Sequence, residues 1–251
     1  MEKTLLIGNG LNRTLQFSIS WSELLCDIAK EHNVEYIPDL PMPLEFERII
    51  NTILKKSDVP NSQIYSDVKA RIARKVKDVK LPDDAIHREL ATVKSNAIIT
   101  TNYDYLLEYA YNRSFNYKGK TNLKYLWEAT SVQQGIKFYH MHGMADNPAS
   151  ICLGYEHYMG IVENLRSMLN AKVQNRQDEM KIKRILKGED APTDYWGERF
   201  YTTDVDIIGL GLTTVESDIW WLLTHRASIY YTNYCDCLLY TSDAADDLIG
   251  V

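Results

Sequence analysis

The chain has 251 residues, 45% of them hydrophobic, and its 28 basic and 34 acidic residues give a formal net charge of -6. This length suffices for one large α/β domain with a sizeable core. The acidic balance argues against a general nucleic-acid binder, because such proteins neutralise phosphates with an excess of Lys and Arg. The basic runs at 69–80 and 181–187 are interleaved with apolar residues, which is typical of solvated helix faces.

The sequence contains no apolar segment of membrane-spanning length, and its N-terminus lacks a signal-peptide pattern. We therefore expect a cytoplasmic protein without a membrane partner. The four cysteines lack the paired CxxC spacing of a structural zinc site. Neither a zinc module nor a disulfide framework is expected in this compartment.

The first predicted element is a short apolar strand, Thr4–Ile7, which runs into the turn Gly8-Asn9-Gly10-Leu11-Asn12. A glycine turn between a strand and a helix is typical of phosphate-binding βα junctions, where the backbone approaches a diphosphate closely. The third glycine of the GxGxxG motif is missing, so a plain tight turn explains these residues equally well.

Two long stretches, about 20–94 and 155–187, have helical periodicity. The first begins with a capping box, in which Ser20 is the N-cap residue and Glu23 completes the pair. Because these stretches lie between predicted strands, we interpret them as helical insertions that form a subdomain beside the sheet.

The central predicted strand, Ala97–Thr101, is a run of apolar and β-branched residues that ends at Asn102-Tyr103-Asp104 and passes into a helix. A buried strand with an amide and a carboxylate at its carboxyl end places them where open α/β sheets bind ligands. Each residue also has a structural interpretation. Asn102 could cap the following helix, and Asp104 could stabilise its first turn.

Later strands are predicted at Tyr125–Val132, Ile136–His140, Ser150–Gly154, Val205–Ile208 and Ser228–Tyr231. Strands alternating with helices predict a Rossmann-like, doubly wound, mainly parallel sheet with an added helical subdomain and no zinc module. In such a sheet the residues that follow the strands converge on one crevice. We therefore expect four segments to meet there: Gly8–Asn12, Thr101–Asp104, His140–Gly143 and Gly209–Gly211.

His140 and His142 alternate at the end of a predicted strand, so one of them is expected to face the core as a structural histidine. A metal site that combines both with Asp146 is conceivable. Two alternating histidines without a third fixed ligand are a poor metal signal, and we predict no metal.

The segment Cys237–Asp247 resembles the translation of a sequencing-library adapter. A segment of this origin does not contribute to the fold of the natural protein. We therefore predict that the domain occupies residues 1–236, that 237–251 is a non-native tail, and that the natural protein continues differently beyond this point.

An amide, a carboxylate and an imidazole around a dinucleotide suit the removal of a good leaving group from a ribosyl carbon. The oxocarbenium-like transition state needs charge stabilisation and a positioned acceptor rather than a strong nucleophile. Asn102 could fix a ribose hydroxyl or a water, and His142 could accept a proton from it.

The combination of GNG, TTNYD, HG and GLGL after successive strands resembles a SIR2-like, sirtuin-type domain over residues 4–232, and the zinc-free bacterial group is the nearer match. The resemblance implies an NAD site, with Asn102 and Asp104 at the nicotinamide ribose and His142 as catalytic base. It implies NAD contacts from Gly8, Gly10 and Asn12 at the diphosphate side and from Gly209, Gly211 and Thr213 at the adenosine half, with Glu216 and Asp218 nearby. Asn9 and Thr101 are further expected NAD-binding residues.

Two departures from the family pattern bear on activity. The four-cysteine zinc module of deacylating sirtuins is missing, and TTN replaces their TQN triplet. For zinc-free bacterial members the resemblance implies hydrolysis of NAD to ADP-ribose and nicotinamide. It also implies an effector role in anti-phage defence by abortive infection, a homo-oligomer, and a partner protein such as a translocase or nuclease. An NAD-dependent deacylase and a non-catalytic sensor of NAD or ADP-ribose remain the alternatives.

Overall fold

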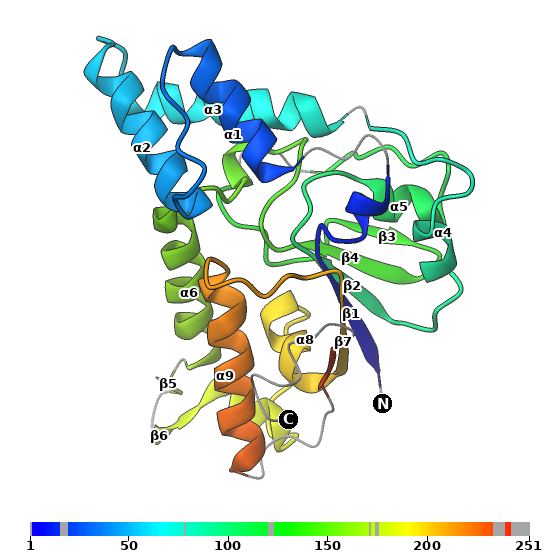
Figure 1. The fold of residues 1–251 in the computed structure, drawn as a ribbon. Helices are drawn as coiled ribbons and strands as arrows, with labels where there is room; N and C mark the ends of the chain where they lie inside the picture. The colour runs from blue at the N-terminus through cyan, green and yellow to red at the C-terminus, as the bar shows by residue number, and fades with distance from the viewer. Residues whose placement is uncertain are drawn as a thin grey trace.

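The computed structural model describes residues 2–15, 20–77, 79–119, 123–170, 172–173, 176–232 and 239–241. Its central feature is a six-stranded sheet in the order β3-β4-β2-β1-β7-β8 (Figure 1). The neighbours β4, β2, β1, β7 and β8 run parallel, and β3 is antiparallel to β4. The strands are β1 (Lys3–Ile7), β2 (Ala97–Thr100), β3 (Ser131–Gln133), β4 (Ile136–His140), β7 (Asp204–Ile208) and β8 (Leu239–Thr241).

The register of the parallel strands aligns their carboxyl ends. Ile7 of β1 lies beside Thr100 of β2 and Ile208 of β7, and Thr100 lies beside His140 of β4. The segments that follow these four residues therefore leave the same edge of the sheet. This alignment brings together the four sequence segments that were expected to converge.

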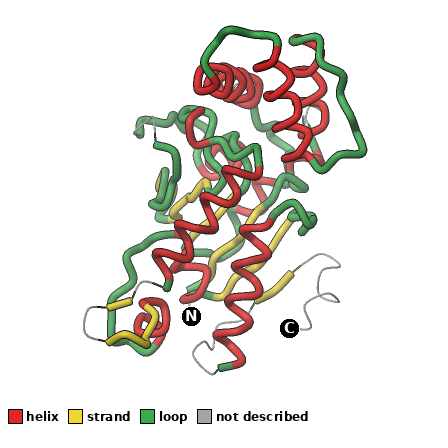
Figure 2. Tube along the Cα trace, turned by 90° about the vertical axis from the view of Figure 1, so that its left-hand side faces the viewer, coloured by secondary structure: helices red, strands yellow, loops and turns green. Residues whose placement is uncertain are grey.

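Helices cover both faces of the sheet, because its central strands are apolar on both sides. On one face, α6 (Tyr155–Leu169), α7 (Lys181–Leu186), α8 (Trp196–Thr202) and α9 (Ser217–Tyr231) pack on Leu6, Ile99 and Tyr139. Helices α6 and α9 lie side by side (Figures 1 and 2). On the other face, α4 (His87–Leu90) and α5 (Leu106–Tyr111) pack on Leu5, Ile98 and Phe138. The structure confirms the predicted Rossmann-like, mainly parallel α/β sheet.

Three further helices, α1 (Trp21–Glu31), α2 (Met42–Lys55) and α3 (Asn61–Lys77), lie beyond the carboxyl ends of the strands (Figure 1). They share a separate apolar core that includes Leu25, Phe46 and Ile72. Ser20 and Glu23 form the predicted capping box at the start of α1. This helical unit comes from the predicted insertion at 20–94, whereas α6 and α7 of the predicted insertion at 155–187 pack on the sheet.

Several local predictions were wrong. Ser228–Tyr231 is the last turn of α9, because Leu222, Arg226 and Ile229 continue one buried helical face. Ser150–Gly154 is not a strand, since Ile151 and Leu153 pack into the core of the helical unit instead of joining the sheet.

Two further boundaries differ from prediction. The strand expected at Tyr125–Val132 is shorter and begins at Ser131. The insertion at 155–187 is not entirely helical, because it contains a small antiparallel pair, β5 (Lys172–Val173) and β6 (Arg176–Met180).

The segment predicted to be a non-native tail, 237–251, contains β8, and its other residues lie outside the described part of the chain. Its non-native origin stays a prediction. Across the described residues, no helix is both long enough and apolar enough to cross a membrane.

Candidate active site

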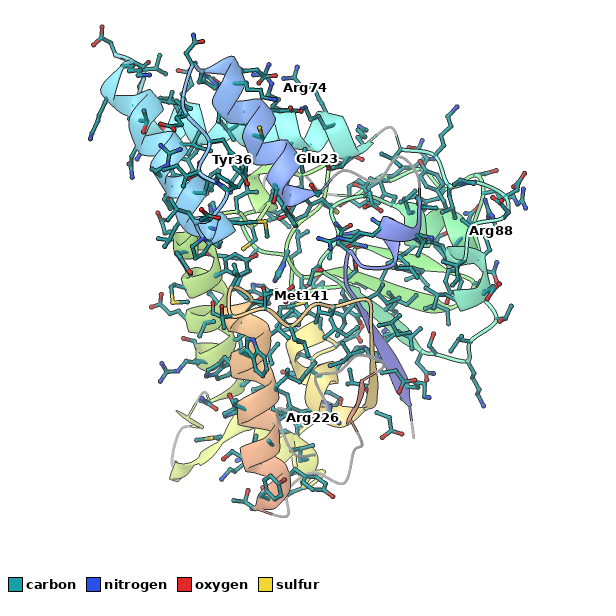
Figure 3. The ribbon with its side chains drawn as sticks, viewed as in Figure 1. Glu23, Tyr36, Arg74, Arg88, Met141 and Arg226 are labelled. Carbon is teal, nitrogen blue, oxygen red and sulfur yellow. The ribbon has the colours of Figure 1, made fainter. Side chains whose placement is uncertain are left out.

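A cavity of about 440 Å³ lies at the carboxyl edge of the sheet. Its floor comes from the turns that follow β1, β2, β4 and β7, and its roof comes from Trp21, Leu24, Met42 and Val76 of the helical unit. Met141, the residue before His142, lies near the middle of the molecule (Figure 3). Ten of the eleven residues predicted for the site line this cavity: Asn9, Gly10, Asn12, Thr101, Asn102, Asp104, His142, Gly209, Gly211 and Thr213.

Asn102 has a fixed backbone and an unpartnered side chain. Its N–H donates to Thr100 Oγ1 at 3.1 Å, and its carbonyl accepts from His140 Nδ1 at 2.8 Å. The residue is only 5% exposed, yet neither atom of its amide has a hydrogen-bond partner in the described structure. Because buried polar groups are nearly always paired, this amide indicates a missing ligand. The interpretation of Asn102 as a helix cap is wrong.

His140 is the structural histidine of the alternating pair. It is fully buried, and its Nε2 lies 3.0 Å from Glu108 Oε1. Burial disfavours the charged ring, but the Glu108 carboxylate and the Asn102 carbonyl raise the pKa of His140 above its ordinary value. An imidazolium donates from both nitrogens, which suits these two acceptors. His140 therefore supports the backbone of Asn102 from below.

Asp104 accepts hydrogen bonds from the first residue of α5 and from Asn12. Its Oδ1 accepts from the Leu106 N–H at 3.0 Å, at the start of α5. Its Oδ2 accepts from Asn12 Nδ2 at 2.7 Å, and Asn12 Oδ1 accepts from His87 Nε2 at 2.8 Å. Burial raises the pKa of Asp104, although these hydrogen bonds oppose the shift. The Asn12 amide was expected to contact the diphosphate, but it hydrogen-bonds to the Asp104 carboxylate instead.

His142 lines the cavity and contacts a carboxylate on its other side. Its Nε2 lies 2.7 Å from Asp218 Oδ2, and both side chains are buried. Burial disfavours the imidazolium, but the Asp218 charge and hydrogen bond raise the pKa of His142 above its ordinary value. The ring also packs edge-on against Tyr158, with centroids 5.3 Å apart. The amide of Asn102 and the imidazole of His142 therefore both belong to residues that line the cavity.

Part of the chain that carries these residues is similar to a known family. Residues 96–182 match the SIR2-like domain family. The match includes Asn102, Asp104 and His142, and it implies an NAD-related activity. No curated protein matches the chain. The glycine turns after β1 and β7 lie outside the matched residues, but the fold places them at the same cavity.

The glycine turns after β1 and β7 pack on each other. The N–H of Gly8 donates to the Ile208 carbonyl at 2.9 Å, and the N–H of Gly10 donates to the Gly209 carbonyl at 2.7 Å. A Cβ atom on Gly8 would lie 2.5 Å from the Gly209 oxygen. Gly8, the one predicted residue that does not line the cavity, is therefore needed for contact between the turns.

Three residues at the cavity had no assigned role at the sequence level. Asp218 was expected only near the adenosine half, but it contacts His142 directly. Tyr158 was unassigned and supports the same ring. Arg13 is the only cation among the described residues that line the cavity. Its place directly after the GNGLN turn is a signal that could have identified it.

The proposed ligands of a metal site do not converge. His140 contacts Glu108, His142 contacts Asp218, and Asp146 Oδ1 accepts from Lys77 Nζ at 2.5 Å. Within the described ranges, no group of three His, Cys, Asp or Glu side chains is arranged to hold a metal ion.

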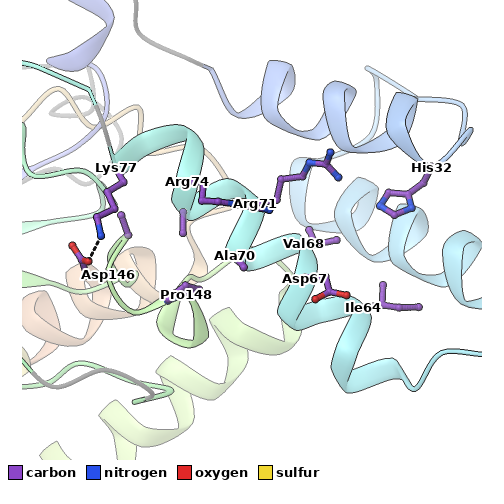
Figure 4. A pocket seen from close by; sticks show the side chains of 12 residues that line it. His32, Ile64, Asp67, Val68, Ala70, Arg71, Arg74, Lys77, Asp146 and Pro148 are labelled. Carbon is purple, nitrogen blue, oxygen red and sulfur yellow. Dashed lines mark hydrogen bonds and ion pairs between the residues drawn. The ribbon is translucent and has the colours of Figure 1, made fainter.

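A second hollow, of about 760 Å³, lies between α3 and the loop Ala145–Pro148 (Figure 4). None of the predicted site residues lines it. Its cations are largely paired, since Arg71 contacts Glu31 at 2.6 Å and Lys77 contacts Asp146. The basic run at 69–80 thus serves to attach α3 to its neighbours, as a plain helix face would.

Replacing Gly143 by alanine should prevent formation of the loop that carries His142. Gly143 has a φ of +97°, and an added Cβ would collide with the backbone of Ser150. We expect Gly143→Ala to lower the melting temperature by about 10 °C or more, or to abolish soluble expression. Gly188→Ala is the matched control, because its φ of +73° adds strain without any clash. If thermal denaturation shows the same loss of melting temperature for both substitutions, the clash with Ser150 does not cause the loss in Gly143→Ala.

Proposed function

We propose that this SIR2-like domain hydrolyses the nicotinamide–ribose bond of NAD, giving ADP-ribose and nicotinamide. The observation that carries the proposal is the buried, unpartnered amide of Asn102 in the same cavity as His142. A ribose hydroxyl or a water supplies the hydrogen-bonding partner that this amide lacks. The cavity is lined by polar side chains and by the backbone of two glycine turns. An extended dinucleotide needs both kinds of contact.

In the proposed reaction the C–N bond to nicotinamide breaks and a C–O bond to water forms at the same carbon. Asn102 holds the ribose hydroxyl or the attacking water, and the unprotonated nitrogen of His142 accepts the proton that is released. The Asp104 carboxylate, held by Asn12, stabilises the positive charge that develops on the ribosyl ring. Nicotinamide leaves as a neutral molecule, so no acid is needed to protonate it.

The two glycine turns are proposed to hold the rest of the dinucleotide. Asn9 and Gly10 of the first turn and Gly209, Gly211 and Thr213 of the second line the cavity, and the two turns are in contact through the Gly10–Gly209 hydrogen bond. The resemblance to zinc-free bacterial members supports an effector role in anti-phage defence, with a homo-oligomer or a translocase or nuclease partner switching the enzyme on.

The proposed function is tested by following NAD with the protein alone, oligomerised, and mixed with an acetylated peptide. We expect equal amounts of nicotinamide and ADP-ribose, independent of the peptide. Formation of O-acetyl-ADP-ribose would show a deacylase instead. Saturable NAD binding without turnover in every form would show a sensor.

Replacing Arg13 should weaken substrate binding without slowing the chemical step. Arg13 is exposed and faces a cavity whose other charged lining residues, Asp104 and Glu216, are acidic. A diphosphate therefore needs this cation as a counter-charge. We expect Arg13→Ala to raise KM about tenfold, equivalent to ~1.4 kcal/mol, with little change in kcat. Arg166→Ala, an exposed arginine on α6 outside the cavity, should leave both constants unchanged. An unchanged KM in Arg13→Ala would contradict this role.

A further inference from the structure

Asp218 and His142 form a buried pair between two distant parts of the chain. His142 follows β4, and Asp218 is the second residue of α9. Asp218 is fully buried, and its Oδ2 lies 2.7 Å from His142 Nε2. A carboxylate in the first turn of a helix is favoured by the helix dipole. Its Oδ1 has no hydrogen-bond partner among the described residues, so the contact with His142 is the one that orients this carboxylate.

We propose that Asp218 is a positioning residue that fixes His142 in the tautomer with its proton on Nε2, so that an unprotonated Nδ1 is presented to the cavity. The inference rests on the proposed function, because it names the atom that accepts the proton. An ionised carboxylate only accepts hydrogen bonds, so Nε2 of His142 must donate. In a neutral imidazole the other nitrogen is then the acceptor.

The surroundings of the ring favour this orientation. The carbonyl of His142 accepts from the Cys152 N–H at 2.8 Å, which fixes the backbone. Tyr158 packs edge-on against the ring, at an interplanar angle of 86°, which opposes its rotation. No hydrogen-bond partner of His142 Nδ1 occurs in the part of the chain that the structure describes. This nitrogen is therefore free to meet a ligand in the cavity that His142 lines.

The charges around the pair are few. Glu216, just before α9, and Asp218 both raise the pKa of His142 against the effect of burial. Tyr158 of α6, Cys152 of the loop after β4 and Tyr103 after β2 also face Asp218, and burial raises the pKa of each of these groups. These three groups are neutral at ordinary pH. Asp218 is thus the charge in direct contact with the ring.

The experiment compares wild type with Asp218→Asn by nitrogen NMR of the histidine rings, using His142→Gln to assign the signals. In wild type above the pKa of His142, we expect a protonated Nε2 and an unprotonated Nδ1. An asparagine amide can donate to Nε2, so Asp218→Asn should move the proton to Nδ1. A wild-type ring with its proton on Nδ1, or an unchanged tautomer in the variant, would overturn the proposal. This readout does not depend on turnover.

Kinetics provide the second readout. Asp218→Asn should lower kcat about 100-fold or more with little change in KM, as expected for an impaired general base. The acid limb of the pH profile should move to lower pH, because the charge that raises the pKa of His142 is gone. In a His142→Ala background the substitution should cause no further loss. Unchanged kcat in Asp218→Asn of an active enzyme would overturn the inference and leave NAD hydrolysis standing.

A matched control separates this role from simple structural support. Glu198 is also a buried carboxylate, held by Lys181 Nζ at 2.6 Å, but it does not line the cavity. Glu198→Gln should lower the melting temperature and leave kcat and the pH profile unchanged. If wild type does not hydrolyse NAD while the tautomer changes in Asp218→Asn as expected, the proposed function fails and the positioning role stands.

Discussion

Asn102→Ala should stay folded and release nicotinamide from NAD at least 100-fold more slowly than wild type. The loss of rate follows from removing the group that we propose holds the ribose hydroxyl or the water, because loss of such a positioning group has an effect of this order in other enzymes. The fold is retained because neither atom of the amide has a partner to lose. Burying an unpaired amide costs about 1–3 kcal/mol, which offsets the packing lost on truncation. We expect a melting temperature equal to or above that of wild type.

Asn147→Ala is the matched control for this result. Asn147 is fully buried like Asn102, but its Nδ2 donates to the Leu123 carbonyl at 2.8 Å. Removing this amide leaves a carbonyl without its partner and should cost about 1–3 kcal/mol of unfolding free energy. A larger loss of stability in Asn102→Ala than in Asn147→Ala would show that the Asn102 amide has a structural role.

His142→Ala should lose both activity and stability. Without the imidazole, the Asp218 carboxylate is buried and unpaired, a change that typically costs about 3–5 kcal/mol. The double variant with Asp218→Asn should recover part of this stability, because it removes the uncompensated charge. Neither variant should release nicotinamide. Urea denaturation of the two variants and wild type measures the effect, and a double variant no more stable than His142→Ala would contradict it.

The stability difference between wild type and His142→Ala should depend on pH. The pKa of His142 is raised in the folded protein, so its contribution is complete below the unfolded value of about 6.5 and is lost as pH rises through the folded pKa. The difference should therefore narrow from pH 6 to pH 9.

For His225 we expect the opposite pH dependence of stability, because burial lowers its pKa. The stability difference between wild type and His225→Ala should widen as pH rises from 5 to 7.

The convergence of the site segments could be predicted because it follows from local signals. In a parallel sheet, the segments that follow neighbouring strands leave the same edge. Asn102 follows one strand, His142 follows a second, and the two glycine turns follow two more, so all of them line one cavity. The direction of each side chain could not be predicted in this way. The hydrogen bonds of Asn12 to Asp104 and His87 depend on the packing of α4. This helix has only four residues, which is too short for a helical periodicity to show in the sequence.

The pairing of Asp218 with His142 was beyond sequence reasoning for a similar reason. The two residues are 76 positions apart, and their contact requires α9 to start beside the end of β4. The same helix shows why Ser228–Tyr231 was misjudged. Its β-branched and aromatic residues resemble a strand in isolation, but tertiary packing extends the helix through Ile229.

NAD hydrolysis is tested by the rate at which free nicotinamide appears from NAD with wild type and with Asn102→Ala, assayed side by side under identical conditions. We expect equimolar nicotinamide and ADP-ribose from wild type and at least a 100-fold lower rate from a folded Asn102→Ala. Equal rates from the two proteins, or no release above the uncatalysed rate from wild type, would contradict it.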